Sequence, residues 1–416
     1  MRRPRSISYS PLTRHFRELF ATHAEAERRK MPVDEVAGER QERLLTRRKL
    51  LAEATAASAV LAGVSLKPAR AATSARIAIV GAGLAGLRCA HMLWTGGSRI
   101  PSTVYEADTT HIGGRCWSLR GYFRNGLVGE HGGAFINHDE TAIRSLSKNL
   151  GLKEEVVSGG DLPSGEEIFW FDGKPYTYDD ANADWRAIGY PVFQSAYKQA
   201  PWPQRYNSST AEGRRLDQVT IPDWLDQTGI GSNTRFGRLM LANSVSVGMG
   251  QSAKIHVQVQ RKTWPALGYS GVSYTDWNAY CVAWDDSVPL GTSGPAILLG
   301  FPGGSTGQNV LTGAAHGKAP TKDVNWFLNQ IEPVFPGTKA AYSGLAYEDH
   351  WSADPWHQGA YSYWRLGQYT GFSGYEGVQE GNVHFAGEHT DPEEQGFLNG
   401  AVSSGERAAS EIMHQV

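Results

Sequence analysis

The chain has 416 residues, of which 40% are hydrophobic and 11% are aromatic. This length and composition can bury a large core, most simply in two domains, and they exclude a disordered or fibrous protein. The first 71 residues carry 15 of the 40 basic and 8 of the 42 acidic side chains. The remaining residues therefore have 25 basic and 34 acidic side chains, a net charge of −9. This acidic charge argues against nucleic acid or anionic lipid as a partner and favours cationic small molecules.

Residues 1–71 have the features of an export signal. The segment TRRKLLAEATAASAVLAGVSLKPARA contains the twin arginine Arg47 and Arg48, then a weakly apolar run, then a small-residue cleavage site at Ala69-x-Ala71. It resembles a bacterial twin-arginine signal, which predicts a protein exported to the periplasm or outside the cell. An ordinary amphipathic surface helix is the structural alternative. The run is too short and too weakly hydrophobic to predict a stable membrane span.

The next predicted elements are a buried strand, RIAIV, and a helix, LRCAHMLW, joined by the glycine-rich turn GAGLAG. In this turn Gly81 permits a tight bend, Gly83 lets the backbone approach a pyrophosphate, and Gly86 lets helix and strand pack closely. A second strand, STVYEAD, ends in Glu106, 20 residues beyond Gly86, where a carboxylate can accept hydrogen bonds from a ribose. These features predict a dinucleotide-binding unit and leave FAD and NAD open.

Two further glycine-rich segments follow, HIGGRCWSLRG and GEHGGAFI. Glycine at Gly114, Gly132 and Gly133 lets the backbone lie against a flat ring or a phosphate. Arg115 can supply a charge-assisted hydrogen-bond fork to such a group.

Residues from about 155 to 250 are loop-rich, with a predicted hairpin in PSGEEIFWFDGKPYTYDD and a predicted helix in ADWRAIGYPVFQSAYKQ. Strands are predicted in SYTDWNAYCVAWDD and PAILLGFPGG, and a surface helix in TKDVNWFLNQIEPVFPG. The segment NVHFAGEHTDPEEQGFLNGAVSSGERAASEI predicts a strand, a loop and a long helix. On that helix Ala401, Gly405, Ala408 and Ile412 share one face that is small enough for close packing.

In combination, six segments resemble the flavin-dependent amine oxidase family, which includes monoamine, polyamine and L-amino acid oxidases. They are GAGLAG, EAD…GGRCWSLRG, EHGGAFI, AKIHVQVQRKTW, GAYSYW and FAGEHT…QGFLNGAVSSGERAA. The resemblance implies an α/β fold, with a Rossmann-like FAD-binding domain formed by residues 75–150 and 380–416. Residues 151–379 are then expected to form a mixed-sheet α+β substrate domain.

The resemblance also implies how FAD is held. Its pyrophosphate is expected at the glycine turn, its ribose at Glu106, and its phosphate and ribityl portion near Arg115, Gly387 and Glu388. Relatives with covalent flavin have a cysteine where this chain has Ala360, so the FAD is expected to be non-covalent. No metal is expected, because the histidines show no ligand spacing.

Four side chains are expected at the reactive edge of the flavin. Lys254 matches a lysine that holds a water beside flavin N5 in relatives, although a lone lysine in an alternating strand is otherwise solvent-facing. Tyr361 and Phe397 match two aromatic residues that flank the amine. Trp351 matches a tryptophan near the isoalloxazine, and core packing is an equal alternative for it.

The implied reaction is oxidative deamination of an amine or L-amino acid, with hydride transfer to flavin N5, hydrolysis of the imine, and reoxidation by O2 that yields H2O2. The sequence leaves open which substrate is used and whether the protein is a homodimer. An L-amino acid also needs a cationic anchor for its carboxylate. Arg365 lies near the aromatic pair in sequence, whereas Arg115 is already assigned to the cofactor.

One departure from the family lies near residues 246–252. Relatives carry a long segment between LMLANSVSVGMG and QSAKIHVQVQ that this chain lacks, and its loss predicts unpaired strand edges and exposed apolar surface. A flavin-binding or inactive remnant of the family is therefore the alternative function. A nicotinamide enzyme with a Rossmann fold is a third interpretation, which leaves the C-terminal half unexplained.

Overall fold

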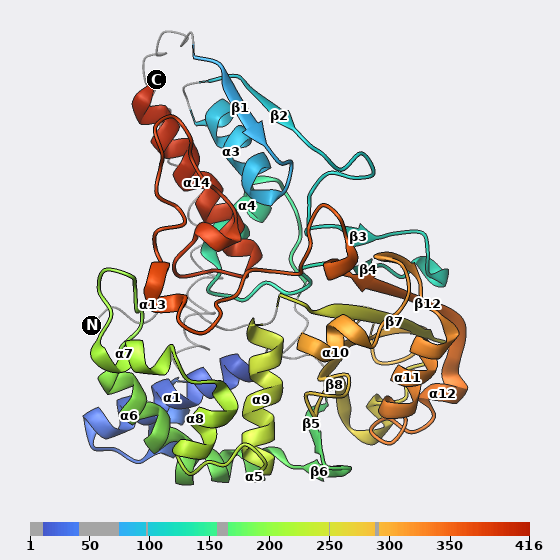
Figure 1. The fold of residues 1–416 in the computed structure, drawn as a ribbon. Helices are drawn as coiled ribbons and strands as arrows, with labels where there is room; N and C mark the ends of the chain where they lie inside the picture. The colour runs from blue at the N-terminus through green and yellow to red at the C-terminus, as the bar shows by residue number, and fades with distance from the viewer. Residues whose placement is uncertain (1–10, 41–74, 97–98, 156–164, 249, 288–290) are drawn as a thin grey trace, which may run out of the picture.

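The computed structural model describes residues 11–40, 75–96, 99–155, 165–248, 250–287 and 291–416. In Figure 1 the upper part of the molecule brings the C-terminal helix beside the elements that follow residue 75, and the lower part holds a large sheet and a group of helices. The twin arginine and the Ala-x-Ala site lie outside the described residues.

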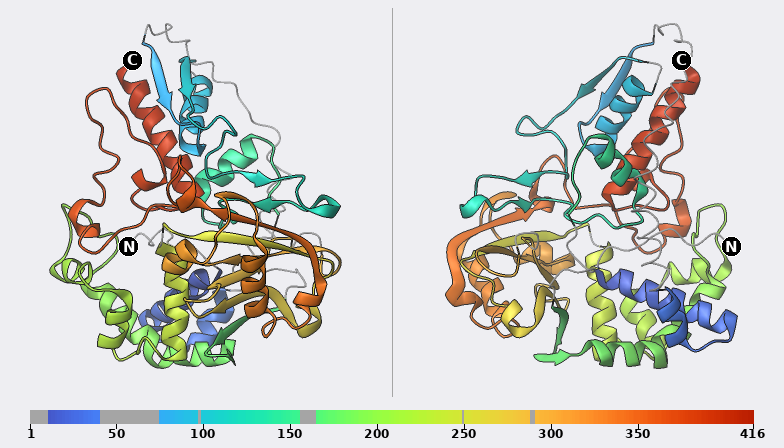
Figure 2. Two further views of the ribbon diagram at one scale, coloured as in Figure 1. Left: turned by 45° about the vertical axis from the view of Figure 1, so that its right-hand side comes forward. Right: turned by 180° about the vertical axis from the view of Figure 1, so that it is seen from behind.

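The upper part is a parallel strand pair packed on helices. β1 and β2 pair in parallel because α3 connects them. Helix α14 runs alongside α3 in all views (Figures 1 and 2) and approaches it so closely that a Cβ at Gly405 would lie 2.4 Å from the carbonyl oxygen of Ala85. The elements are β1 (Ile77–Val80), α3 (Leu84–Thr95), β2 (Ser102–Tyr105), β3 (Ser118–Leu119), β4 (Gly129–Glu130), α4 (Thr141–Asn149) and α14 (Leu398–Gln415).

The predicted small face of α14 is confirmed in most of its length. Gly405, Ala408 and Ile412 are buried against α3, whereas Ala401 is half-buried. The strand predicted just before the helix is wrong, since residues 382–386 form no strand beyond one isolated bridge. Side chains of α14 take its place, because Arg407 donates a hydrogen bond to the carbonyl oxygen of Phe385.

Within the described chain, β1 and β2 form a sheet of two strands only. Ile79 on one face is buried against the helices, but on the other face Val80 is 89% exposed and Tyr105 is 58% exposed. This open sheet with apolar residues in solvent is what the missing central segment predicts.

The lower part contains an eight-stranded mixed sheet in the order β11-β12-β7-β10-β9-β8-β5-β6. All neighbouring strands are antiparallel except β5 and β8, which are parallel. The predicted hairpin is confirmed as β5 and β6, and the strands predicted later in the chain are confirmed as β8, β9 and β10. Strand β7 lies inside this sheet, with apolar residues packed against α11 on one face. The strands are β5 (Glu166–Phe171), β6 (Lys174–Tyr176), β7 (Ala253–Val259), β8 (Tyr269–Thr275), β9 (Val282–Asp285), β10 (Ala296–Phe301), β11 (His316–Lys318) and β12 (Tyr342–His350).

Helices complete the lower part, and a second core cluster forms where they meet β5, β8 and β9. The predicted helices before residue 200 and after residue 320 are both present, as α6 and α11. The helices are α1 (Pro11–Arg29), α5 (Tyr178–Asp184), α6 (Tyr190–Gln199), α7 (Ala211–Leu216), α8 (Ile221–Gln227), α9 (Arg235–Gly248), α10 (Gly304–Asn309), α11 (Thr321–Ile331), α12 (Thr338–Ala341) and α13 (Tyr369–Phe372).

Helix α1 belongs to the stretch that the sequence assigns to an export signal, yet it packs on the lower part. The rings of Phe20 and Tyr190 lie 5.5 Å apart, and the Tyr190 hydroxyl donates to the Glu27 carboxylate at 3.1 Å. Among the described helices, none has both the length and the apolar character needed to cross a bilayer.

Candidate functional site

The second face of β7 is polar and looks toward the upper part. Lys254 is only 3% exposed, and its Nζ donates hydrogen bonds to the carbonyl oxygens of Glu130 at 2.7 Å and Gly132 at 2.6 Å. Burial lowers the pKa of Lys254. The alternative of an ordinary solvent-facing lysine is therefore wrong.

Two of the predicted aromatic residues are anchored close to this strand. The Tyr361 hydroxyl lies 3.0 Å from Oγ of Ser252, two residues before Lys254. Trp351 is buried, and its indole Nε1 donates to the carbonyl oxygen of His131 at 3.1 Å. Segments that are far apart in the sequence thus meet beside Lys254.

The carboxylate of Glu388 holds the backbone on both sides of the aromatic pair. It accepts hydrogen bonds from the N–H groups of Ser362 at 2.9 Å and Gly396 at 2.7 Å, the direct neighbours of Tyr361 and Phe397. Arg115 joins this arrangement, because its guanidinium donates to Glu388 at 3.2 Å.

Arg115 also donates to the carbonyl oxygen of Ala360 at 2.9 Å. Residues expected to contact the cofactor therefore also fix the segment that carries Tyr361. The sequence did not predict this second role of Arg115 and Glu388.

The glycine turn has the geometry of an anion site. Gly81 has a φ of +98°, and a Cβ at Gly86 would lie 2.1 Å from the carbonyl oxygen of Gly81, so both positions require glycine. A Cβ at Gly83 would meet nothing within 4 Å, so this backbone is open to a ligand at the start of α3, where no side chain caps the helix. Glu106 accepts from the N–H of Ala82 at 2.7 Å, which ties the second strand to the turn.

The other predicted glycines connect this turn to Lys254. A Cβ at Gly114 would lie 3.3 Å from Cα of Gly83, and one at Gly132 would lie 1.9 Å from the carbonyl oxygen of Arg115. A Cβ at Gly133 would lie 2.7 Å from the Leu398 side chain at the start of α14. Gly387, which precedes Glu388, has a φ of +149°, and a Cβ there would lie 2.5 Å from the His389 ring.

These features fit FAD at two of its parts. The open turn and the uncapped helix N-terminus suit a pyrophosphate, and buried Lys254 lies close to the anchored side chains of Tyr361 and Trp351. The described residues include no further strand on β1 and β2 to cover an adenosine.

A group of buried histidines and aspartates lies beside the lysine and was missed by sequence reasoning. Nitrogen and oxygen atoms of His131, His316 and Asp349 lie within 4.8 Å of one another. These residues are too far apart in the sequence to show any spacing signal. The pairing of β11 with β12 sets His316 opposite Asp349, and the segment after β4 adds His131.

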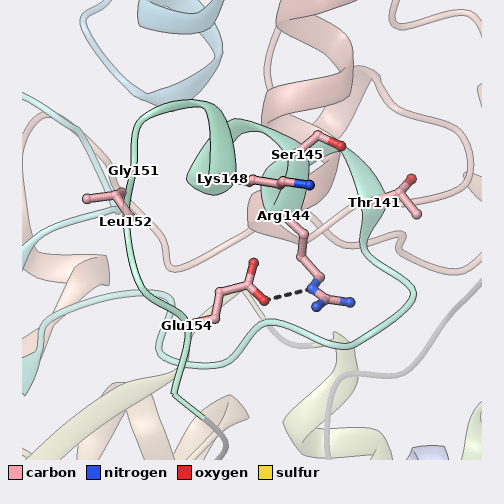
Figure 3. A pocket seen from close by; sticks show the side chains of 7 residues that line it. All are labelled: Thr141, Arg144, Ser145, Lys148, Gly151, Leu152 and Glu154. Carbon is pink, nitrogen blue, oxygen red and sulfur yellow. Dashed lines mark hydrogen bonds and ion pairs between the residues drawn. The ribbon is translucent and has the colours of Figure 1, made fainter. Parts of the chain in front are cut away.

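A surface hollow lies elsewhere, beside α4 (Figure 3). Arg144 and Glu154 form an ion pair at 2.9 Å across it. None of the predicted site residues lines this hollow, which is formed by Thr141, Arg144, Ser145, Lys148, Gly151, Leu152 and Glu154.

Comparison with known proteins agrees with this geometry. The family model of the flavin containing amine oxidoreductases matches residues 84–245 and 237–413. The chain is 28% identical over 171 residues to an L-amino acid dehydrogenase of Synechocystis, a match that covers 40% of this chain and 34% of that protein. It is 28% identical over 176 residues to flavin-containing amine oxidase B of Sus scrofa, covering 40% of this chain and 32% of that protein.

Solved structures share the fold over a longer stretch. Cyclohexylamine oxidase from Brevibacterium oxydans superposes with a TM-score of 0.68 at 18% identity and covers 82% of this chain and 99% of its own. Putrescine oxidase bound to putrescine gives a TM-score of 0.64 at 18% identity with the same coverage. The sequence matches span at most 34% of the length of the curated relatives.

The predicted fold class is confirmed by these neighbours, and the family model covers well over half of the sequence. The chain belongs to the family of flavin-containing amine oxidoreductases.

Proposed function

We propose that the protein catalyses the FAD-dependent oxidative deamination of a small amine, with O2 as the electron acceptor. The observation that supports this best is the meeting of buried Lys254 with the Tyr361 segment, which Glu388 and Arg115 hold in place. Bound FAD would take a hydride from the α carbon of the neutral amine, and O2 would reoxidise it with release of H2O2.

The chain's own residues supply position and charge. In this proposal Lys254 holds a water at the reactive edge, and Tyr361 and Phe397 flank the amine so that its α C–H faces the flavin. The FAD is held without a covalent bond, because Ala360 offers no thiol. Water then hydrolyses the imine to a carbonyl compound and ammonia.

The arginines favour an amine over an L-amino acid as substrate. The guanidinium of Arg115 is engaged by Glu388 and the Ala360 carbonyl, and Arg365 is exposed. Neither therefore offers a free cation inside the site for a substrate carboxylate. The net charge of −9 on residues 72–416 also favours the approach of a cationic amine.

The open strand pair supports a second candidate function. With Val80 and Tyr105 in solvent and two strands only in the described sheet, FAD could be held too weakly for turnover. The protein would then be a flavin-binding or inactive remnant of the family.

One experiment separates the two candidates. The purified protein is incubated with FAD, and the excess FAD is removed. The visible spectrum of the protein is then recorded before and after anaerobic addition of primary amines and L-amino acids. An amine oxidase is yellow, is bleached by a substrate, and releases peroxide when air is admitted. A protein that stays colourless, or a yellow protein that no amine bleaches, contradicts the proposal.

A further inference from the structure

A buried network of histidines and carboxylates links β12 to the segment 351–361. Asp349 on β12 accepts hydrogen bonds through Oδ1 from Nδ1 of His131 at 2.6 Å and from Nδ1 of His316 at 2.7 Å. Its other oxygen accepts from Nε2 of His256 at 3.1 Å. Three imidazole rings from three different segments thus converge on one fully buried carboxylate.

His316 is a bridge between two carboxylates. Its Nδ1 faces Asp349, and its Nε2 lies 2.9 Å from Oδ2 of Asp354. An imidazole that donates from both nitrogens carries two N–H groups and a positive charge. Burial alone would lower the pKa of His316, but hydrogen bonds and charge from the two aspartates raise it.

The two aspartates are correspondingly kept ionised. Burial opposes ionisation of Asp354, but hydrogen bonds from His316 and from the backbone lower its pKa to about 2. Burial also opposes ionisation of Asp349, and the three imidazoles hold its pKa well below the usual value.

The bridge shapes the segment that carries the aromatic residues. Asp354 accepts through Oδ1 from the N–H groups of Trp356 at 2.7 Å and His357 at 3.1 Å, which forms the turn after Trp351. The His316 ring packs edge-on against the Trp351 indole, with ring centres 4.7 Å apart. His316 therefore fixes both the turn and the indole.

The same network reaches Lys254. Asp349 is the cross-strand partner of Lys254 in the β12–β7 ladder. The two carbonyl groups that accept from Lys254 belong to Glu130 and Gly132, on either side of His131, whose ring is held by Asp349. Asp349 thus lies opposite Lys254 on the neighbouring strand and also holds His131, between the two residues whose carbonyl groups accept from Lys254.

We propose that the Asp349–His316–Asp354 bridge is the positioning element of the site, which holds the Trp351–Tyr361 segment in register with Lys254. This inference rests on the proposed amine oxidation and adds to it a residue that acts through others. His316 is the centre of the bridge because it binds both carboxylates, one through each ring nitrogen.

Hydrogen bonds explain this cluster better than a metal ion does. Ligand atoms around a tetrahedral zinc, at bonds of about 2.0–2.1 Å, lie roughly 3.3 Å apart. The Nδ1 atoms of His131 and His316 lie 2.6 and 2.7 Å from the same Asp349 oxygen, a hydrogen-bond distance.

The bridge predicts a loss of rate as the pH rises above about 6.5. Because the pKa of His316 is raised in the folded protein, the charged bridge is complete below about pH 6.5 and is lost as the pH rises through the higher folded value. A neutral imidazole has only one N–H group, so one of the two aspartates then loses its hydrogen bond from His316. The titratable groups that interact with His316 itself are Asp349, Asp354 and His131. Those that interact with its two aspartates are Lys254, His256, His357 and Asp108.

The test compares two variants of the bridge with a matched control in the FAD-loaded protein. His316→Gln removes the charge and one of the two donors, and Asp354→Asn keeps an oxygen for the backbone N–H groups but removes one carboxylate. His384→Gln is the control, because His384 pairs with Glu411 near the far end of α14. FAD content and thermal unfolding are measured for each protein.

The readout is the rate of anaerobic flavin reduction by substrate as a function of pH. His316→Gln is expected to lower the rate at least tenfold, with little change in the substrate concentration at half-maximal rate, and to remove the fall in rate at rising pH. Asp354→Asn is expected to move that fall to lower pH, because His316 loses one anionic partner. Unchanged rates and pH profiles in both variants, or equal losses in His384→Gln, overturn the proposal.

A second readout is independent of turnover. Nitrogen-15 NMR of the histidine side chains below about pH 6.5 is expected to show an imidazolium that is missing in His316→Gln. A neutral His316, or stoichiometric zinc in the purified protein by elemental analysis, overturns the bridge. If the wild-type protein shows the imidazolium but no amine reduces its flavin, the bridge stands and the proposed function fails.

Discussion

At the scale of single residues, the site depends on a lysine whose charge is costly to bury. Lys254 gains two backbone carbonyl acceptors, and burial still lowers its pKa. A strand position that alternation alone assigns to solvent is thus occupied by a buried amine.

Substitution of Lys254 by Met tests its proposed role. The thioether keeps most of the volume but cannot hold a water, so FAD should stay bound while flavin reduction or reoxidation slows by about 10²-fold or more. Stopped-flow absorbance measures both half-reactions, and Lys318→Met on the exposed end of β11 serves as the control. Unchanged rates in Lys254→Met would remove this residue from the site.

Glu348 predicts a pH dependence of stability that is separate from activity. Burial and the neighbouring Asp323 raise the pKa of Glu348 to about 8. Between the unfolded value of about 4.3 and this folded value, the folded protein keeps a proton that the unfolded chain releases, so stability falls as pH rises. At about 1.4 kcal/mol per pKa unit, the free energy of unfolding falls by a few kcal/mol over this pH range.

The Glu348→Gln variant should flatten this dependence and be more stable than the wild type at pH 8. Urea unfolding at several pH values measures it, with exposed Glu166→Gln as the control. A variant whose unfolding midpoint still falls in parallel with the wild type would show that another group is responsible.

At the scale of elements, the stability of the upper part of the molecule depends on the close approach of α14 to α3. A Cβ at Gly405 would lie 2.4 Å from the Ala85 carbonyl oxygen, which is backbone and cannot rotate away. Gly405→Ala should therefore destabilise the protein by about 1–3 kcal/mol through overpacking. Urea unfolding checks this against Ser410→Ala on the same helix, and equal stability of the two variants would contradict the packing.

Helix α1 gives a prediction about maturation. If residues 1–71 are removed on export, the ring of Tyr190 loses its contact with Phe20 and the chain loses the apolar area that α1 buries. A protein that starts at Ala72 should unfold at a lower temperature than the full chain, by about 1–1.5 °C for each kcal/mol lost.

The variants Phe20→Ala and Arg28→Ala separate packing from chain length, since Arg28 on the same helix is exposed. Phe20→Ala should reproduce part of the loss, whereas Arg28→Ala should not. If removal of residues 1–71 leaves the unfolding temperature unchanged, α1 is not a stabilising part of the fold.

The elements also show what the sequence could predict. The strand before GAGLAG and the helix after it, the hairpin of β5 and β6, and the small face of α14 follow from local periodicity and glycine spacing. The expected burial of that strand was wrong for one face, because Val80 is 89% exposed. The prediction of a strand at residues 382–386 was wrong: Arg407 on α14, the next α-helix along the chain, donates a hydrogen bond to the Phe385 carbonyl oxygen, where a neighbouring strand would have donated one.

At the scale of the whole molecule, the two ends of the family region meet around one site, as the resemblance implied. The site residues could be named from motifs, but their supports could not. Glu388 contacts the neighbours of both aromatic residues, and Asp349 binds three histidines, through contacts between segments that are distant in sequence. Such contacts leave no periodic signal.

The central claim is that one FAD lies between the glycine turn and Lys254. A crystal structure of the FAD-loaded protein tests it most directly. The account predicts density for the pyrophosphate at Gly81–Gly86 and for the isoalloxazine ring against Lys254, Tyr361 and Phe397. A saturated protein whose flavin ring lies away from these three side chains, or that takes up no FAD at all, would contradict it.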